Sequence, residues 1–280
     1  MSGSFTVACV QTTSGTEVAP NIAAASALVR AAAADGGADF VLLPETVNIM
    51  EPKNKRLFEK IAPEEDDECL KAFRALAQET NIWLLAGSLV VKDSAPPPEG
   101  GRAKAHNRSF LIDPGGEIAA RYDKIHMFDV DLGDGETYRE SKTYEPGGKA
   151  VSADLPWGRL GMTVCYDLRF PHLYRALAQG GAEFVSIPSA FTQPTGIAHW
   201  HVLMRARAIE NGCFVFAPAQ CGEHEGGRKT YGHSLIIDPW GEVLADGGLD
   251  AGFVSAEIDP AQVAEARAKI PSLEHDRDFE

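Results

Sequence analysis

The sequence predicts an α/β protein, a four-layer α-β-β-α sandwich of two similar halves in a single domain over residues 1–280. Strand-like apolar segments alternate with helix-like segments along the chain, and such strands need apolar cover on both faces of their sheet. A repeat supports two halves, because SFLIDPGGEIAA, from Ser109, and SLIIDPWGEVLA, from Ser234, match at seven positions. Hairpins with a DPxG turn are common, but strand–helix alternation on both sides of the repeat favours two halves, each contributing one sheet.

The elements of the first half follow from apolar runs and the residues that end them. We expect strands at 5–11, 39–45 and 81–91, helices at 20–38 and 69–80, and a hairpin at 108–124. The first helix is rich in alanine, with Pro20 near its start and two glycines at its end, which are typical helix boundaries. Asp113-Pro114-Gly115-Gly116 predicts the hairpin turn, and the proline and glycine content of 94–105 predicts a surface loop.

The second half repeats this alternation after a polar, glycine-rich stretch at 126–150 that we expect to be a loop. We expect hairpins at 150–167 and 234–248, strands at 182–190, 213–220 and 252–259, and helices at 171–182, 198–212 and 260–270. No composition break separates the halves into independent domains.

Composition limits the class of function. The 280 residues carry a net charge of −14, which argues against a nucleic-acid partner but leaves an anionic substrate possible. Residues 1–11 have no basic segment, and no apolar run reaches about 18 residues, so we expect neither a secretory signal nor a membrane span. The five cysteines are odd in number and scattered, which favours reduced thiols and a cytoplasmic location.

Cys165 is the strongest candidate for a catalytic residue. An apolar run ends at Val164, and Pro171 marks the start of a following helix. A thiol between a strand and a helix N-terminus is exposed to helix amides that favour the thiolate. A single cysteine is more often a core residue, but Asp167 and Arg169 directly after the strand favour a functional turn.

Three further charged residues are candidates for the same site. Glu45 ends the strand DFVLLPE, where a carboxylate could act as a general base. Lys124 lies in RYDKIHMFD, and its ammonium could stabilise an oxyanion or a thiolate. Glu140 lies in a polar loop, where a second carboxylate could position groups. Residues of these types are usually solvated, so spacing alone does not select them.

The segments LLPE, YDKIHMFD and VCYDLRFP, in this order, resemble the signatures of the nitrilase or carbon–nitrogen hydrolase superfamily. The resemblance covers nearly the whole chain and implies one domain of this family. It implies that Cys165 is the nucleophile, Glu45 the general base and acid, and Lys124 the oxyanion-stabilising lysine. Glu140 would be the additional glutamate of the site, and the backbone amide of Tyr166 the second oxyanion donor.

The resemblance also implies a mechanism and an assembly. Cys165 would attack a small-molecule amide, release ammonia and form a thioester that water hydrolyses, with no metal and no organic cofactor. Members of the superfamily pair through helices next to the catalytic cysteine. We therefore expect a homodimer or a higher homo-oligomer, with the helices from Pro171 and from Ala198 near the interface.

Within the superfamily, SAFTQPTGIAHW, APAQCGEH and RKTYGHS resemble deaminated glutathione amidases, and omega-amidases are the alternative. Phe191 and Thr192 are expected to line the pocket, although ordinary packing at a strand end would also explain them. Arg228 and Lys229 could hold a substrate carboxylate, or could be solvated loop charges.

Two alternatives to a hydrolase exist, and Glu45, Lys124 and Cys165 are all present in the sequence. A non-catalytic dimeric binding protein on the same fold would be indicated by a missing catalytic residue, and an amine rather than water could accept the acyl group.

Phosphate-binding glycine motifs are absent from the sequence. Cys221 with His224, and His199 with His201, have metal-like spacing but lack a second pair in sequence, so we expect no zinc site.

Overall fold

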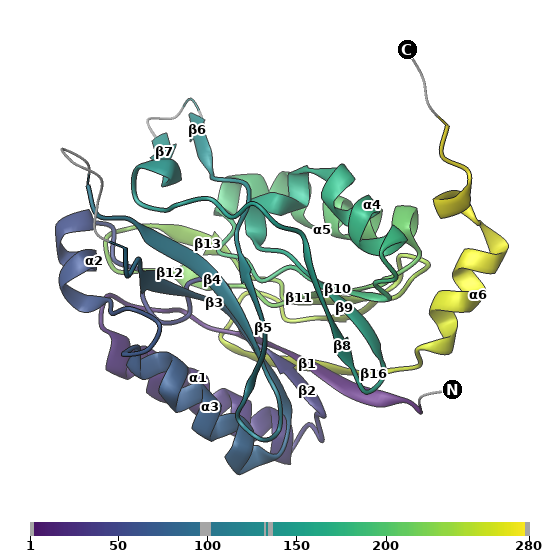
Figure 1. Cartoon of the computed structure of the whole chain (residues 1–280), viewed down its shortest axis with the longest axis horizontal. Coiled ribbons are helices and arrows are strands. Elements are labelled where there is room, and N and C mark those ends of the chain that lie inside the picture. Colours follow the sequence, from purple (N-terminus) through teal and green to yellow (C-terminus); the bar gives the residue numbers. More distant parts are fainter. Residues whose placement is uncertain (1–2, 96–101, 132, 134–136, 278–280) are drawn as a thin grey trace.

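Two six-stranded sheets form the middle layers of the computed structural model, which describes residues 3–95, 102–131, 133 and 137–277 (Figure 1). The helices α1 (Val18–Ala34) and α3 (Glu68–Thr80) cover the outer face of the first sheet, and α4 (Pro171–Gln179) and α5 (Gln193–Asn211) lie against the second. The predicted α-β-β-α sandwich is therefore confirmed. Most of the loop expected at 94–105 falls on 96–101, outside the described residues.

The first sheet has the strand order β16-β1-β2-β3-β4-β5. Its strands are β16 (Gly252–Ile258), β1 (Phe5–Gln11), β2 (Phe40–Leu42), β3 (Trp83–Lys92), β4 (Ala105–Ile112) and β5 (Ile118–Asp123). The three central strands β1, β2 and β3 are parallel, and the strands outside them pair antiparallel. Parallel strands need cover on both faces, which accounts for the apolar sequences of β1 and β2.

The second sheet repeats this pattern with the order β15-β14-β11-β10-β9-β8. Its strands are β15 (Val243–Asp246), β14 (Leu235–Ile237), β11 (Phe214–Ala217), β10 (Phe184–Ser186), β9 (Gly158–Met162) and β8 (Val151–Leu155). Here β9, β10 and β11 are the parallel centre. The two sheets therefore have matching topologies, as the two-halves interpretation predicts.

The hairpins that carry the sequence repeat occupy equivalent places in the two sheets. β4 and β5 end the first sheet, and β14 and β15 end the second. In each turn the aspartate, Asp113 or Asp238, accepts hydrogen bonds from the amides two and four residues later. Gly116 and Gly241 then adopt positive φ angles of 79° and 87°, which glycine tolerates without strain. The repeated DPxG sequence thus encodes one turn geometry twice.

Several smaller elements were not expected from the sequence. They are the helix α2 (Asn54–Lys60), the ribbon of β6 (Asp129–Asp131) with β7 (Thr137–Arg139), the ribbon of β12 (Cys221–Glu223) with β13 (Lys229–Tyr231), and the 3-10 helices η1 (Glu140–Lys142) and η3 (Ser272–Glu274). The helix α5 begins at Gln193, earlier than the predicted 198, because Pro194 fits the first turn of a helix. The last helix, α6 (Ala261–Lys269), agrees with the prediction.

A shared apolar core holds the two sheets together. Phe40 of the first sheet meets Phe216 of the second edge-to-face, with ring centroids 6.3 Å apart, and Phe5 meets Phe184 at 5.5 Å. All four rings are buried, and each contributes roughly 2–3 kcal/mol through removal from water. This packing joins the two sheets whose strands lead to the candidate catalytic residues. Among the described residues, no helix is both long and apolar enough to cross a membrane.

Candidate active site

Cys165 lies on a sharp backbone turn that follows β9. Its φ angle is +47°, a left-handed conformation that is unusual for a residue with a side chain. Its amide donates to the carbonyl oxygen of Pro188 at 2.9 Å. The residue opens a 3-10 helix, η2 (Cys165–Arg169), and α4 begins only at Pro171. The sequence correctly predicted the turn and the role of Pro171, but the thiol does not lie at the N-terminus of an α-helix.

The fully buried carboxylate of Asp167 holds this turn in place. It accepts hydrogen bonds from the Val164 amide at 2.8 Å and the Tyr122 hydroxyl at 2.6 Å through Oδ2. Its Oδ1 accepts from the His126 amide at 3.0 Å and lies 2.7 Å from the His126 ring. The charged residue that directly follows the apolar strand therefore supports the turn. Asp167 does not line the active-site cavity.

Glu45, Lys124 and Glu140 form one buried ionic group next to Cys165. The Lys124 ammonium donates to Glu45 Oε1 at 2.9 Å and to the two Glu140 oxygens at 2.9 and 2.8 Å. The Ala190 amide donates to Glu45 Oε2 at 2.8 Å. Glu45 and Lys124 come from the ends of β2 and β5, while Cys165 comes from the other sheet, so the site lies where the two halves meet.

The surroundings of Cys165 favour the thiol, whereas the sequence interpretation favoured the thiolate. Burial and the neighbouring Glu45 carboxylate raise the pKa of the thiol well above its ordinary value, against the opposing effect of Lys124. Two carboxylates and one ammonium already leave the group with a net negative charge, and a thiolate would add to it. The geometry instead suits a thiol that is hydrogen-bonded to Glu45 and loses its proton to that carboxylate.

The ionic partners hold Glu45 and Lys124 in their charged forms. Burial alone would raise the pKa of Glu45, but the charge and hydrogen bond of Lys124 lower it below its ordinary value. Burial alone would lower the pKa of Lys124, but Glu140 and Glu45 raise it well above its ordinary value. The carboxylate is thus available as a base, and the ammonium as a fixed positive charge.

Asn107 on β4 is a member of the site that the sequence analysis missed. Its side-chain amide donates to Glu45 Oε1 at 2.8 Å and to Glu140 Oε1 at 3.3 Å. The side chain is buried, and its own oxygen has no hydrogen-bond partner among the described residues. Asn107 lies between Ala105 and Ser109 on the buried face of β4, and a polar residue at such an alternating inward position is the signal that could have found it.

The backbone amide of Tyr166 is a candidate donor to an oxyanion. In the first turn of η2, the Cys165 amide donates to Pro188 and the Asp167 amide to Val164. The Tyr166 amide between them has no acceptor within the described part of the chain. Unpaired amides at the start of a helical turn are the usual donors to an anion.

These groups open into one cavity of about 390 Å³. All seven site residues expected from the sequence line it: Glu45, Lys124, Glu140, Cys165, Tyr166, Phe191 and Thr192. Phe191 packs against Trp200, with ring centroids 5.2 Å apart, and the Thr192 hydroxyl bonds to Thr195 at 2.7 Å. Both residues are buried, so they contribute to packing and to the cavity wall together.

The adjacent basic residues Arg228 and Lys229 have different surroundings. Arg228 lines the cavity, donates to the Ala190 carbonyl oxygen at 2.6 Å, and holds its guanidinium 5.6 Å from the centre of the Tyr138 ring. Its Nε is buried without a partner among the described residues. Lys229 is exposed and lies 3.4 Å from Glu223, outside the cavity lining. Only Arg228 is therefore placed to meet a ligand.

The two residue pairs with metal-like spacing in the sequence, Cys221 with His224 and His199 with His201, do not form ligand pairs in the structure. His224 uses both ring nitrogens, at 2.9 Å from the Ser14 carbonyl oxygen and 2.7 Å from the Thr230 hydroxyl, and does not pair with Cys221. His199 contacts Arg169, whereas His201 faces His233 and Asp246. The partners of His201 are distant in sequence, which is why its spacing with His199 was uninformative.

Comparison with known proteins identifies the family. The family model described as carbon–nitrogen hydrolase matches residues 6–268. The chain belongs to this family. It is accordingly a hydrolase of carbon–nitrogen bonds other than peptide bonds, with named amidases among its relatives.

Its similarity to individual members extends over almost the full chain. Deaminated glutathione amidase of Synechocystis is 42% identical, covering 97% of each chain. Omega-amidase NIT2 of Homo sapiens is 34% identical, covering 98% of this chain and 95% of the relative. The crystal structure of the C. elegans NitFhit protein superposes with a TM-score of 0.88 at 36% identity, covering 99% of this chain and 66% of that chain.

Proposed function

We propose that this hydrolase is a thiol-dependent amidase whose substrate is deaminated glutathione, cleaved through a thioester at the secondary amide that joins its 2-oxo acyl chain to cysteinylglycine. The observation that carries the proposal is the contact of Glu45 with Lys124 beside Cys165 in one cavity. The name of the Synechocystis relative supports the choice of substrate. A non-catalytic binding protein on this fold would be expected to lack one of these groups.

In the first step, Glu45 takes the Cys165 proton as the sulfur attacks the amide carbonyl carbon. Lys124 and the Tyr166 amide stabilise the oxyanion that forms, and they are held in place before substrate arrives. Glu45 then gives the proton to the departing nitrogen, which leaves as the amine of cysteinylglycine. The acyl group remains on sulfur as a thioester.

In the second step, Glu45 removes a proton from a water molecule that attacks the thioester carbon. The same two donors stabilise the second oxyanion, and the carboxylic acid product leaves as the thiol is reprotonated. An amine that occupied the place of this water would give acyl transfer, so the acceptor is settled by product analysis. Glu140 and Asn107 act by positioning Lys124 and Glu45.

Arg228 is the group we assign to substrate recognition. Deaminated glutathione carries carboxylates away from its amide, and a guanidinium with an unpaired Nε at the cavity wall suits such a group. Phe191 and Thr192 would form the adjoining wall.

The experiment is a comparison of kcat/KM values for deaminated glutathione, measured by release of cysteinylglycine, and for 2-oxoglutaramate and a plain aliphatic amide, measured by release of ammonia. The human relative named omega-amidase makes 2-oxoglutaramate the specific alternative. A preference for deaminated glutathione supports the proposal. A hundredfold preference for 2-oxoglutaramate, equivalent to about 2.7 kcal/mol in transition-state binding, would assign the protein to omega-amidase activity.

We further propose that the whole chain acts as one catalytic domain in a cytoplasmic homodimer. The outer face of α5 supports pairing, because Val202 and Ile209, two helical turns apart, are 69% and 51% exposed. The five cysteines are all free, which supports a reducing compartment.

A further inference from the structure

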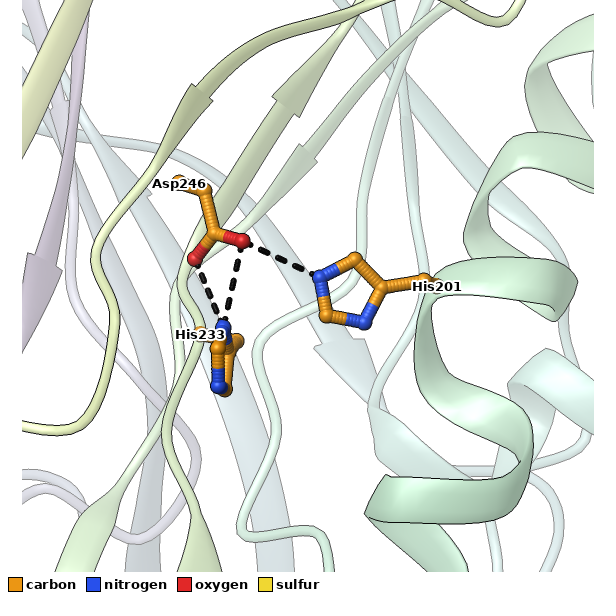
Figure 2. A group of neighbouring side chains, drawn as sticks. All are labelled: His201, His233 and Asp246. Carbon is orange, nitrogen blue, oxygen red and sulfur yellow. Dashed lines mark hydrogen bonds and ion pairs between the residues drawn. The ribbon is translucent and has the colours of Figure 1, made fainter.

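Two histidines and an aspartate converge outside the active-site cavity (Figure 2). His201 lies on α5, His233 precedes β14, and Asp246 ends β15. One ligating atom from each lies within 4.8 Å of the other two. Figure 2 shows both imidazole rings directed at the same carboxylate. Segments far apart in sequence thus bring three metal-binding side chains together.

The distances suit a small divalent ion. His201 Nε2 lies 3.1 Å from Asp246 Oδ2, and His233 Nδ1 lies 2.8 Å from Asp246 Oδ1. A tetrahedral ion with bonds of about 2.0–2.1 Å holds its ligand atoms roughly 3.3 Å apart. Small side-chain rotations would therefore convert these hydrogen bonds into metal bonds.

The backbone around His233 holds its ring in position. The residue has a φ angle of +54°, its amide donates to the Gly248 carbonyl oxygen, and its carbonyl accepts from Trp200 Nε1 at 2.8 Å. The ring stacks on Tyr231, with centroids 4.5 Å apart. Fixed outer contacts of this kind orient the ligands of metal sites.

The Asp246 carboxylate is held by the backbone. The Gly248 amide donates to its Oδ1 at 2.9 Å. The side chains of His201, His233 and Asp246 are 35%, 23% and 35% exposed, so an ion in solution has access to them.

We propose that His201, His233 and Asp246 bind one divalent transition-metal ion of the zinc type, with water completing four-coordination. Two imidazole nitrogens and one carboxylate oxygen form a donor set typical of such ions. On binding, each neutral imidazole carries its proton on the ring nitrogen that faces away from Asp246, and the lone pair of the nitrogen that faces Asp246 binds the ion; a protonated imidazole first releases one proton to solvent. The ion links α5 to the β14–β15 hairpin and takes no part in the catalytic proposal.

The test is a titration of the metal-free full chain, prepared without a polyhistidine tag, with Zn²⁺ by calorimetry and with Co²⁺ by visible absorption. The titration is repeated in a Cys165→Ala background, which removes the active-site thiol as a rival ligand. The site variants are His201→Gln, His233→Asn and Asp246→Asn, because asparagine tolerates the left-handed backbone at 233 and an amide retains the shape of Asp246. His199→Gln, on the same helix, is the matched control.

We expect one ion per chain in both backgrounds, intense Co²⁺ absorption of a four-coordinate site, and at least tenfold weaker binding in each site variant. His199→Gln should bind as the unmodified protein does. Circular dichroism would show that each variant is folded. Absence of binding, or equal binding by the site variants and the control, would overturn the proposal and leave the three residues as a hydrogen-bonded cluster.

Discussion

The Lys124 ammonium lies 2.9 Å from Glu45 Oε1, and both side chains are buried. This contact determines the expected pH dependence of activity. Because the pKa of Glu45 is lowered, the carboxylate persists below the pH near 4.3 at which an ordinary glutamate titrates. Its contribution to stability is present above that pH and is lost as pH falls through the lowered value.

We therefore predict a plot of kcat/KM against pH that stays level from about pH 5 to pH 8 and falls only under more acidic conditions. It should show no inflection near pH 8.5, where a free thiol ionises, because the pKa of Cys165 is raised. The measurement is release of cysteinylglycine from deaminated glutathione in buffers of constant ionic strength. An inflection between pH 6 and 7 would indicate that a group other than Glu45 acts as the base.

Replacement of the nucleophile is the most direct test of the mechanism. Cys165→Ser should lower amide hydrolysis by at least about a thousandfold, since a hydroxyl is far less acidic and less nucleophilic than a thiol. The fold should be unchanged, as judged by circular dichroism. Activity within about tenfold of the unmodified protein, or 1.4 kcal/mol, would remove Cys165 from the role of nucleophile.

Asn107 offers a test of positioning. Asn107→Ala removes donors to two carboxylates, and we expect kcat to fall by about ten- to a hundredfold with a smaller change in KM. The acid limb of the pH profile should also move to higher pH, since the Glu45 carboxylate loses a hydrogen bond.

Asn211→Ala provides the matched control for this substitution. Asn211 is equally buried, also has an unpaired side-chain oxygen among the described residues, and lies on α5 away from the cavity. Its replacement should affect thermal stability but leave the pH profile in place. Similar kinetic effects of both substitutions would show that Asn107 has a purely structural role.

Adjacent basic residues allow the substrate contact to be isolated. Arg228→Gln should raise KM for deaminated glutathione by about ten- to a hundredfold, because a charge-assisted hydrogen bond to a carboxylate is lost. Lys229→Gln, one residue further along, should leave KM nearly unchanged, since that side chain lies outside the cavity lining. Equal effects of the two substitutions would point to long-range attraction rather than contact.

The assembly can be tested on the outer face of α5. Val202→Glu places a charge on an apolar surface and should convert the proposed dimer into monomers, measured by light scattering at micromolar concentration. The control is Ala27→Glu, an exposed position on α1, the helix that covers the first sheet. This substitution should leave the mass unchanged. A fully active monomer of the unmodified protein would contradict the proposal.

The sequence predicted the architecture well, because strand–helix alternation and one repeated turn carry topological information directly. The Asp113 and Asp238 turns occupy matching hairpins as expected. Short elements such as α2 and the β12–β13 ribbon were missed, because their stability depends on tertiary contacts more than on local pattern.

The candidate residues expected from the sequence meet in one cavity, but their electrostatics could not be predicted from the sequence. Local motifs drew attention to Glu45 and Cys165, whereas the protonation state of the thiol depends on three charges brought together from both sheets. Asn107 and the partners of His201 could not be found for the same reason, since each acquires its neighbours only when distant segments meet. Residue type identifies candidate chemistry, and folding determines which candidates interact.

The pairing of β16 with β1 has a consequence for dividing the chain. This last strand pairs with the first along seven positions, from Phe5 with Ile258 to Gln11 with Gly252. A break at 146–150 would give one fragment with the edge of β1 unpaired and another with Cys165 but without Glu45. Each fragment alone would be inert and prone to aggregate, and co-expression of the two would be required to restore activity by complementation.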